Sequence, residues 1–383
     1  MATVNQTRLK DLLLELVQID SLSRKERNVA MRLQREIESA GAVCRYDRAG
    51  EKVGGNTGNL IGRIAATAPG VAPLLLCAHM DTVVPGEGVK PIVEGDIIRT
   101  DGTTVLGGDD KSGCAVICET LHQLKALNIP HGPIDVVFTI CEEVGLLGAK
   151  HLEVDLFEAR EGLVFDSDAP GLLFVRAPGA QSLSFTVKGY EAHAGMAPER
   201  GISAIKIAAE AVAAMRLGRV DDETTANLGI IQGGRAVNIV PNEVTIRGEA
   251  RSRDSGKLTA QVNHMIECFK KAVAKASIAV DGKAIMASFD YSADAQYQAM
   301  NIPEDAPIVR KVVEAAKRTG RTVSTAATGG GCDANIFNQR GFTVANLGTG
   351  MRDIHTVREW LDIKDMVATS EVTVELLKLH AGQ

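Results

Sequence analysis

The sequence predicts an α/β protein in which a mostly parallel sheet is interrupted by a smaller α+β insertion. Continuous apolar segments such as 73–79 and 133–143 alternate with amphipathic helical segments, which is typical of parallel strands covered on both faces. From about residue 177, apolar and polar residues alternate instead, which indicates antiparallel strands with one exposed face. A chain of 383 residues is also too long for one ordinary core, so two domains are expected.

The segment before residue 177 supplies most of the expected α/β elements. Leucines at helical spacing predict a helix over 7–20, and Ser23 with Glu26 matches a capping box for a second helix that Gly41 would end. A further helix is expected over 112–127. The expected strands are 42–47, 59–65, 73–79, 133–143 and 162–168.

The middle of the chain predicts the order strand, helix, strand, strand, helix, strand, which is the ferredoxin-like arrangement. Its helices are expected over 201–217 and 256–276. The α/β character returns with a helix over 306–319 and the strand "FTVANLG". We therefore predict a discontinuous first domain, residues 1–176 and 296–383, and an inserted domain, residues 177–295.

Composition narrows the class of protein. The net charge of −6 argues against nucleic acid as a partner. The sequence has no uninterrupted apolar run of eighteen residues, so a membrane-spanning helix is not expected. Lys10, Asp11 and Glu15 interrupt the N-terminal segment, which indicates a helix of the mature protein and not a signal peptide. Seven scattered cysteines without a C-x-x-C pair are typical of reduced thiols. A cytoplasmic enzyme without nucleic-acid or membrane partners is expected.

Polar residues follow the strand 73–79. His79 and Asp81, two positions apart, would share one side of an extended segment. A carboxylate beside an imidazole can fix its tautomer and raise its basicity, as it does for metal-bound histidines. The alternative is a surface histidine next to a turn aspartate.

The segment "LGGDDKSG" (106–113) is a second site of interest. It faintly resembles a phosphate loop, but Asp110 stands where glycine should precede the Lys-Ser pair. Asp109 and Asp110 suit a cation instead, with the glycines letting backbone come close. The alternative is a polar loop that caps the helix starting near Ser112.

Three further segments present acids or histidine at strand ends or in loops. Glu142 and Glu143 follow a buried strand, Asp166 and Asp168 end the next one, and His355 lies in a loop before the last helix. Each could equally be a turn or cap residue. Together, these oxygen and imidazole groups suit Zn²⁺, Mn²⁺ or Co²⁺ in a catalytic site, with enough ligands for two metals sharing a carboxylate.

These motifs, in this order, resemble the M20 family of di-zinc metallopeptidases, and most closely its tripeptide aminopeptidase (peptidase T-like) branch. They extend from residue 77 to 360. The matching segments are "AHMDTV", "GGDDKSG", "CEEVGLLGA", "FDSD", "EAHAGMAPERGISAI", "GGRAVNIVPNEVTIRGEAR", "GGGCDAN" and "IHTVREW".

The resemblance implies two divalent metal ions per subunit, zinc or else cobalt or manganese. It assigns His79 and Asp166 to one metal, Glu143 and His355 to the other, and Asp109 to both. Asp109 is preferred to Asp110 because the family pattern is Asp, any residue, Lys, and Lys111 fixes the register. By the same resemblance, Asp81 orients His79 and Glu142 is the general base.

The resemblance also gives the inserted domain a role as a lid and as the interface of a homodimer. In the family, a histidine of this domain reaches across the interface to stabilise the oxyanion, and His193 matches its position. The alternative is a loop histidine packed after a strand.

The resemblance implies several substrate-binding residues as well. Asn238 and Arg251 match positions that approach the substrate, with Arg251, or the nearby Arg253, as a clamp for a carboxylate. Gly330 and Gly331 could offer backbone N–H groups to the same carboxylate, or simply form a loop.

The function expected from the resemblance is hydrolysis of short peptides, with release of the N-terminal residue from tripeptides. An M20 carboxypeptidase or N-acyl-amino-acid amidohydrolase would share the metal site. An inactive metal-binding protein is a third alternative, although it would have no use for Glu142 as a base. A nucleotide-binding phosphate loop is disfavoured by Asp110.

Overall fold

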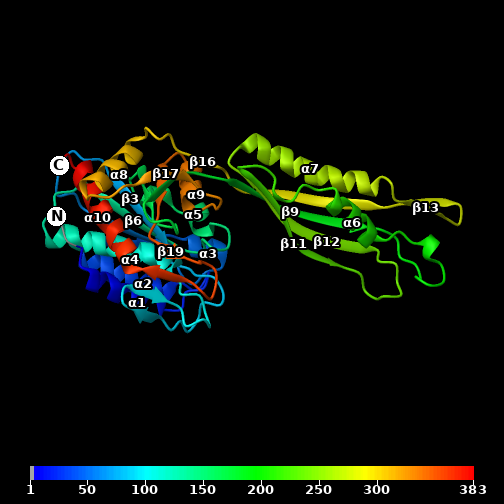
Figure 1. Cartoon of the computed structure of the whole chain (residues 1–383), viewed down its shortest axis with the longest axis horizontal. Coiled ribbons are helices and arrows are strands. Elements are labelled where there is room, and N and C mark those ends of the chain that lie inside the picture. Colours follow the sequence, from blue (N-terminus) through cyan, green and yellow to red (C-terminus); the bar gives the residue numbers. More distant parts are fainter. Residues whose placement is uncertain (1–3) are drawn as a thin grey trace. The chain divides into compact units, whose positions relative to one another are not determined.

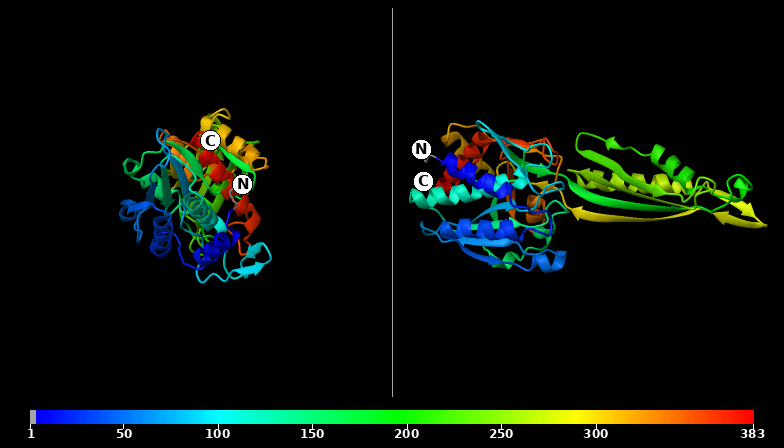
Figure 2. Two further views of the ribbon diagram at one scale, coloured as in Figure 1. Left: turned by 90° about the vertical axis from the view of Figure 1, so that its left-hand side faces the viewer. Right: turned by 90° about the horizontal axis from the view of Figure 1, so that it is seen from below.

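The computed structural model describes residues 4–383, which divide into two compact units. The first unit comprises the chain up to Arg176 together with Asn301–Thr328 and Cys332–Gln383, and the second comprises Ala177–Met300 with Gly329–Gly331. The second unit extends past residue 295, where the sequence placed its end, because strand β15 (Ser288–Tyr297) continues through that position. The first and last helices, α1 (Gln6–Val17) and α10 (Ile363–His380), both belong to the first unit, as the blue and red ribbons show (Figure 2).

The first unit contains one large mixed sheet. Its strands follow the order β1-β2-β6-β3-β7-β18-β8-β16, with β17 also paired to β8. The bounds are β1 (Val43–Tyr46), β2 (Leu60–Ile64), β3 (Leu74–His79), β6 (Ile134–Thr139), β7 (Glu161–Val164), β8 (Leu172–Ala177), β16 (Met300–Asn301), β17 (Ser324–Ala327) and β18 (Thr343–Leu347).

Strand β3 is the point where the strand order reverses. It pairs in parallel with β6 on one side and with β7 on the other. After β3 the chain goes first to β6 and then crosses back to β7. Every residue of β3 and β6 is buried, which explains their continuous apolar sequences. In open parallel sheets, such a reversal creates a binding crevice at the carboxyl ends of the strands.

Helices cover the sheet. α4 contacts β3, and α1, α2 and α10 contact α4, while α8 contacts α10; α5 contacts α3 and α9 in a separate group (Figure 1). Crossover connections between parallel strands are right-handed. The connections from β3 through α4 to β6, and from β6 through α5 to β7, run in opposite directions along the sheet, so α4 and α5 are expected on opposite faces. The bounds are α2 (Arg27–Ser39), α3 (Ala49–Val53), α4 (Gly108–Ala126), α5 (Leu147–His151), α8 (Pro307–Arg318) and α9 (Asp333–Gln339).

A small antiparallel sheet, with strand order β19-β20-β5-β4, was missed by the sequence analysis because its strands have only two or three residues. β4 (Ile92–Glu94) and β5 (Ile97–Arg99) come before α4, whereas β19 (Met351–Arg352) and β20 (Trp360–Asp362) come near the end of the chain. Trp360 pairs with Arg99. This sheet therefore fixes the loop that contains His355 beside the segment that leads to α4.

The second unit has the predicted ferredoxin-like order. Its antiparallel sheet runs β10-β11-β12-β9-β15 and carries two helices, with β13 and β14 forming a separate hairpin. The bounds are β9 (Gly179–Lys188), α6 (Ala204–Ala213), β10 (Gly218–Arg219), β11 (Thr224–Gly233), β12 (Glu243–Ser252), α7 (Ser255–Val273), β13 (Ser277–Val280) and β14 (Lys283–Met286).

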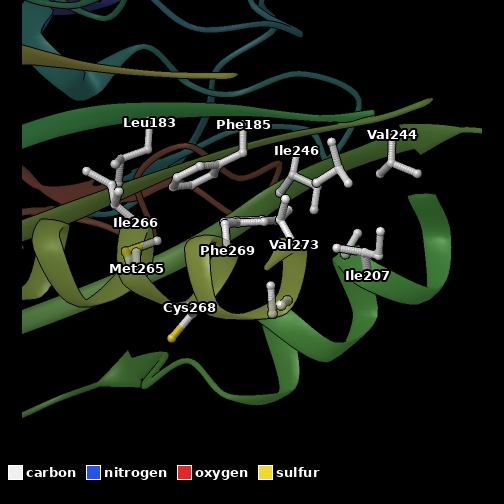
Figure 3. Close-up of a cluster of buried hydrophobic side chains, with 14 of the residues drawn as sticks. Leu183, Phe185, Ile207, Val244, Ile246, Met265, Ile266, Cys268, Phe269 and Val273 are labelled. Atoms are coloured by element: carbon white, nitrogen blue, oxygen red, sulfur yellow. The ribbon is translucent and has the colours of Figure 1, made fainter. Parts of the chain in front are cut away.

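The core of the second unit lies between this sheet and its helices (Figure 3). Phe185 of β9 stacks on Phe269 of α7 with ring centroids 4.4 Å apart, and both side chains are fully buried. The labelled side chains of this core are Leu183, Phe185, Ile207, Val244, Ile246, Met265, Ile266, Cys268, Phe269 and Val273.

The capping box predicted for the second helix does not form. Glu26 is the N-cap of α2, but its carboxylate makes no capping hydrogen bond, and Ser23 Oγ donates to Asp81 instead. The predicted strand over 133–143 also ends earlier, at Thr139, so Glu142 and Glu143 lie in a turn. None of the helices formed by residues 4–383 is long and apolar enough to cross a membrane.

Phe269→Ala should lower the free energy of unfolding of the second unit by about 3–5 kcal/mol, because it removes a fully buried ring and leaves a cavity. Urea unfolding followed by circular dichroism would measure the change. Met286→Ala, at a position that is 64% exposed in the same unit, should change it by less than about 0.5 kcal/mol. Equal stability of the two variants would contradict this account of the core.

Candidate metal centre

The carboxyl ends of the central strands bring the predicted metal ligands together in the first unit. His79 is the last residue of β3, and its Nε2 lies 3.0 Å from Asp109 Oδ1. The other oxygen, Asp109 Oδ2, lies 3.1 Å from His355 Nε2, which is also 3.0 Å from Glu143 Oε2. Potential ligand atoms of His79, Asp110 and Asp166 lie within 4.8 Å of one another, as do those of His79, Asp109 and Glu143.

The two adjacent aspartates have different surroundings. Asp110 Oδ2 accepts a hydrogen bond from His79 N and Asp110 Oδ1 accepts one from Gly113 N, both at 3.1 Å. Asp109 instead places one oxygen against each histidine ring. Asp110 therefore holds the backbone at the end of β3 and the start of α4, while the two Asp109 oxygens face the two histidine rings.

Asp81 orients His79 mainly through its backbone. His79 Nδ1 lies 3.0 Å from the carbonyl oxygen of Asp81 but 3.6 Å from its carboxylate. A ring that donates from Nδ1 leaves the Nε2 lone pair free for a metal. The Asp81 carboxylate accepts from Ser23 Oγ (2.6 Å), Glu142 N (2.9 Å) and Glu143 N (3.3 Å), so it also fixes the turn that carries both glutamates.

A second carboxylate supports the same turn. Cys141 has a φ of +53°, a left-handed conformation that costs a non-glycine residue free energy. Its N–H donates to Glu26 Oε1 at 3.0 Å, and the preceding Ile140 N–H donates to Asn59 Oδ1 at 3.0 Å. Glu26 is fully buried and stabilises this turn, a role that the sequence analysis missed because it assigned Glu26 to a helix cap.

Other supporting residues were also missed. Asn346 on β18 accepts from Asp166 N at 2.9 Å and donates to the carbonyl oxygen of Asp166. Asp333 accepts from Thr139 Oγ1 at 2.5 Å, beside the end of β3. Asn346 is a polar residue within the buried apolar part of β18, and Asp333 lies within the motif "GGGCDAN", so both carried a signal that could have been used.

Burial and mutual repulsion make the cluster electrostatically unfavourable as a set of free carboxylates. Burial raises the pKa of Glu142 and of Glu143, and burial together with Asp109 raises the pKa of Asp166 to about 8. A bound cation would relieve this repulsion. The donors are oxygen and imidazole nitrogen without a thiolate, so the residues fit a pair of divalent ions such as zinc, cobalt or manganese.

The predicted residues of the inserted domain lie in the second unit, and their relation to the metal cluster stays a prediction. His193 Nδ1 accepts from Gly195 N and Met196 N, both at 3.2 Å. The next residue, Ala194, donates its N–H to the carbonyl oxygen of Asn238 at 2.9 Å. The loops carrying His193 and Asn238 are therefore adjacent, and both side chains are exposed.

Arg251 and the glycine segment also lie in the second unit. Arg251 forms a bidentate ion pair with Glu249, at 2.9 Å for both contacts. Ala180 of β9 pairs with Arg251 of β12 on one side and with Tyr297 of β15 on the other. A Cβ atom on Gly331 would lie 2.3 Å from the Tyr297 ring, so a larger residue there would require that ring to move, whereas Gly330 has open space around the same position. Arg253 donates to the carbonyl oxygen of Asp222 at 2.8 Å.

Comparison with known proteins identifies the family. The model of peptidase family M20/M25/M40 matches residues 75–379. The chain is 39% identical over 376 residues to the uncharacterized protein YqjE of Bacillus subtilis, covering 98% of this chain and 99% of that one.

Two solved structures match over the whole chain. Aminopeptidase PepT from Bacillus cereus has a TM-score of 0.89 and 38% identity, covering 99% of this chain and 100% of that one. A tripeptidase from Staphylococcus aureus has a TM-score of 0.93 and 37% identity, with full coverage of both chains. The chain belongs to peptidase family M20/M25/M40.

Proposed function

We propose that this protein is a metal-dependent peptidase that releases the N-terminal residue of tripeptides. The observation that carries the proposal is the cluster of His79, Asp109, Glu143, Asp166 and His355, with Glu142 beside it. The full-length similarity to an aminopeptidase and to a tripeptidase supports the choice of substrate.

In this proposal, His79 and Asp166 would hold one metal ion, Glu143 and His355 would hold the other, and Asp109 would contribute to both. The contacts of the two Asp109 oxygens with the two histidines support the bridging role. Bound metal ions would polarise the scissile carbonyl and make the attacking water more acidic. Zinc is the ion we favour, with cobalt and manganese compatible with the same donors.

Glu142 is the proposed general base. It follows the left-handed Cys141, its backbone is fixed by Asp81, and its side chain is buried among other acids. Burial raises the pKa of Glu142, which brings its proton affinity closer to that of the groups between which it must move a proton. It would take a proton from the attacking water and deliver it to the leaving amine.

The proposed substrate-binding residues are Asn238, Arg251, Gly330 and Gly331, with His193 stabilising the oxyanion. Arg251 can clamp a substrate carboxylate only by sharing or leaving its ion pair with Glu249, which would add a cost to binding. Arg253 is the alternative clamp.

We also propose a cytoplasmic homodimer that associates through the inserted domain. In residues 4–383 all seven cysteines are unpaired, as expected in a reducing compartment. The second unit exposes large apolar side chains, including Met196 (81%), Ile231 (62%) and Val237, which is fully exposed. Large apolar side chains left exposed to water are often covered by an interaction partner.

A substrate panel tests the proposed activity. Metal-loaded protein should release the N-terminal residue from tripeptides, with little action on dipeptides, C-terminally blocked peptides or N-acyl amino acids. Removing the metals with a chelator should abolish hydrolysis, and adding Zn²⁺, Co²⁺ or Mn²⁺ should restore it. Hydrolysis of N-acyl amino acids alone would favour an amidohydrolase, and release of C-terminal residues a carboxypeptidase. Full activity without metal would refute the mechanism.

Paired variants test the assignment of the two neighbouring glutamates. Glu142→Ala should retain both metal ions yet reduce kcat by about 10²–10⁴-fold, because only the proton carrier is removed. Glu143→Ala should instead weaken metal binding, because a ligand is lost. Metal content by mass spectrometry and steady-state kinetics would separate the two effects, and near-normal turnover of Glu142→Ala would remove it from the role of base.

Complementation tests whether His193 acts across a dimer. Neither Glu142→Ala nor His193→Ala homodimers should be active, but heterodimers purified through two different tags should contain one complete site of two. Their activity should be about half that of the wild type if His193 acts in the partner's site. Heterodimers as inactive as their parents would place His193 in its own subunit's site, and a monomer by light scattering would exclude the dimer.

A further inference from the structure

We propose that Glu359 is a positioning residue that holds the loop of Asp109 and the loop of His355 at the spacing that the metal ions require. The inference rests on the proposed function, which makes Asp109 and His355 metal ligands. Glu359 is not proposed as a metal ligand itself, because its carboxylate accepts hydrogen bonds from backbone N–H groups.

The Glu359 carboxylate is tied to the loop before α4. It is 1% exposed, and Oε2 accepts from Leu106 N at 2.7 Å and from Gly107 N at 2.8 Å. The other oxygen, Oε1, accepts from Asp109 N at 3.0 Å. Three hydrogen bonds to one carboxylate fix the backbone from which the Asp109 side chain projects.

The Glu359 backbone is tied to the loop of His355. Glu359 lies four residues after His355, and its N–H donates to the carbonyl oxygen of Thr356 at 3.2 Å. Its own carbonyl oxygen accepts from Thr100 N at 3.1 Å, next to the pairing of β5 with β20. His355 has a φ of +61°, so its backbone conformation depends on these surrounding contacts.

The packing around this carboxylate leaves little freedom. A Cβ atom on Gly108 would lie 3.0 Å from Glu359 Oε1 and 3.0 Å from Leu361 Cδ2. Gly107 has a φ of +74°, which favours glycine. Of the paired glycines in "LGGDDKSG", Gly108 is therefore explained by the close approach of Glu359 and Leu361, and Gly107 by its left-handed backbone.

The proposal predicts a specific loss of metal affinity. Glu359→Gln keeps the size of the side chain but replaces one acceptor oxygen by an amide group that donates, so at least one N–H of the Asp109 loop loses its partner. We expect the affinity for Zn²⁺ or Co²⁺ to fall about 10- to 100-fold, as for other residues that support metal ligands. Titration of metal-free protein against a competing chelator would measure it, and circular dichroism would verify that the metal-free variant is folded.

A matched control is available on α4. Glu119 is also 1% exposed and accepts from Asn5 N, Arg8 Nε and Arg8 Nη2 at 2.6–3.0 Å, but it lies ten residues along the helix from Asp109. Glu119→Gln should lower stability and leave metal affinity unchanged. Gly108→Ala disturbs the Glu359 contact from the other side and should weaken metal binding, which keeps the test usable if Glu359→Gln does not fold.

The outcomes separate this inference from the function on which it rests. Wild-type protein that binds no metal would overturn the proposed function. Wild-type protein that binds two ions, with Glu359→Gln or Gly108→Ala binding them equally well, would overturn only the role of Glu359. An equal loss of affinity in Glu119→Gln would also overturn it, because the effect would then follow from general stability.

Discussion

The burial of many carboxylates at one edge of one sheet is the constraint on which the rest of this site depends. A carboxylate removed from water must find hydrogen-bond donors or a cation. One group, comprising Glu26, Asp81, Asp110 and Glu359, accepts backbone N–H groups. Each such bond contributes about 1.5–3 kcal/mol, and leaving the group unpaired would cost a comparable amount. The remaining acids face histidines and one another, which is the arrangement that a divalent cation stabilises.

This division also separates the residues that shape the site from those proposed to do its chemistry. The turn at Cys141 and the loop at His355 are both left-handed at a non-glycine residue. The buried Glu26 accepts the Cys141 N–H, whereas the buried Glu359 connects the His355 loop to the loop before α4 through its carboxylate. The strand reversal at β3 brings the turns together, since neighbouring parallel strands end at the same edge. The short pairing of β5 with β20 adds the loop of His355 from far along the chain.

Much of the fold and of the cluster could be predicted because the signals are local. The buried strands appear as apolar runs, and the change to antiparallel strands appears as alternation. His79 ends a strand, and Glu143 and Asp166 follow within a few residues of strand ends. The errors also have local causes. Glu26 has the spacing of a capping residue, and only the folded chain places its carboxylate under a turn 115 residues away. Two- and three-residue strands such as β5 and β20 have no periodicity to detect.

The sequence alone determined the α/β fold with its insertion, the family resemblance and the set of candidate ligands, because strand periodicity and motif order depend on residues close together in the chain. The tertiary structure decided which groups each carboxylate contacts. Asp110 accepts backbone N–H groups, unlike Asp109, and the Asp81 carboxylate accepts the N–H of Glu142. Glu359 connects its own loop to Asp109, 250 residues earlier in the chain. These roles follow from which backbone N–H groups reach each oxygen, and only the folded chain brings those groups together.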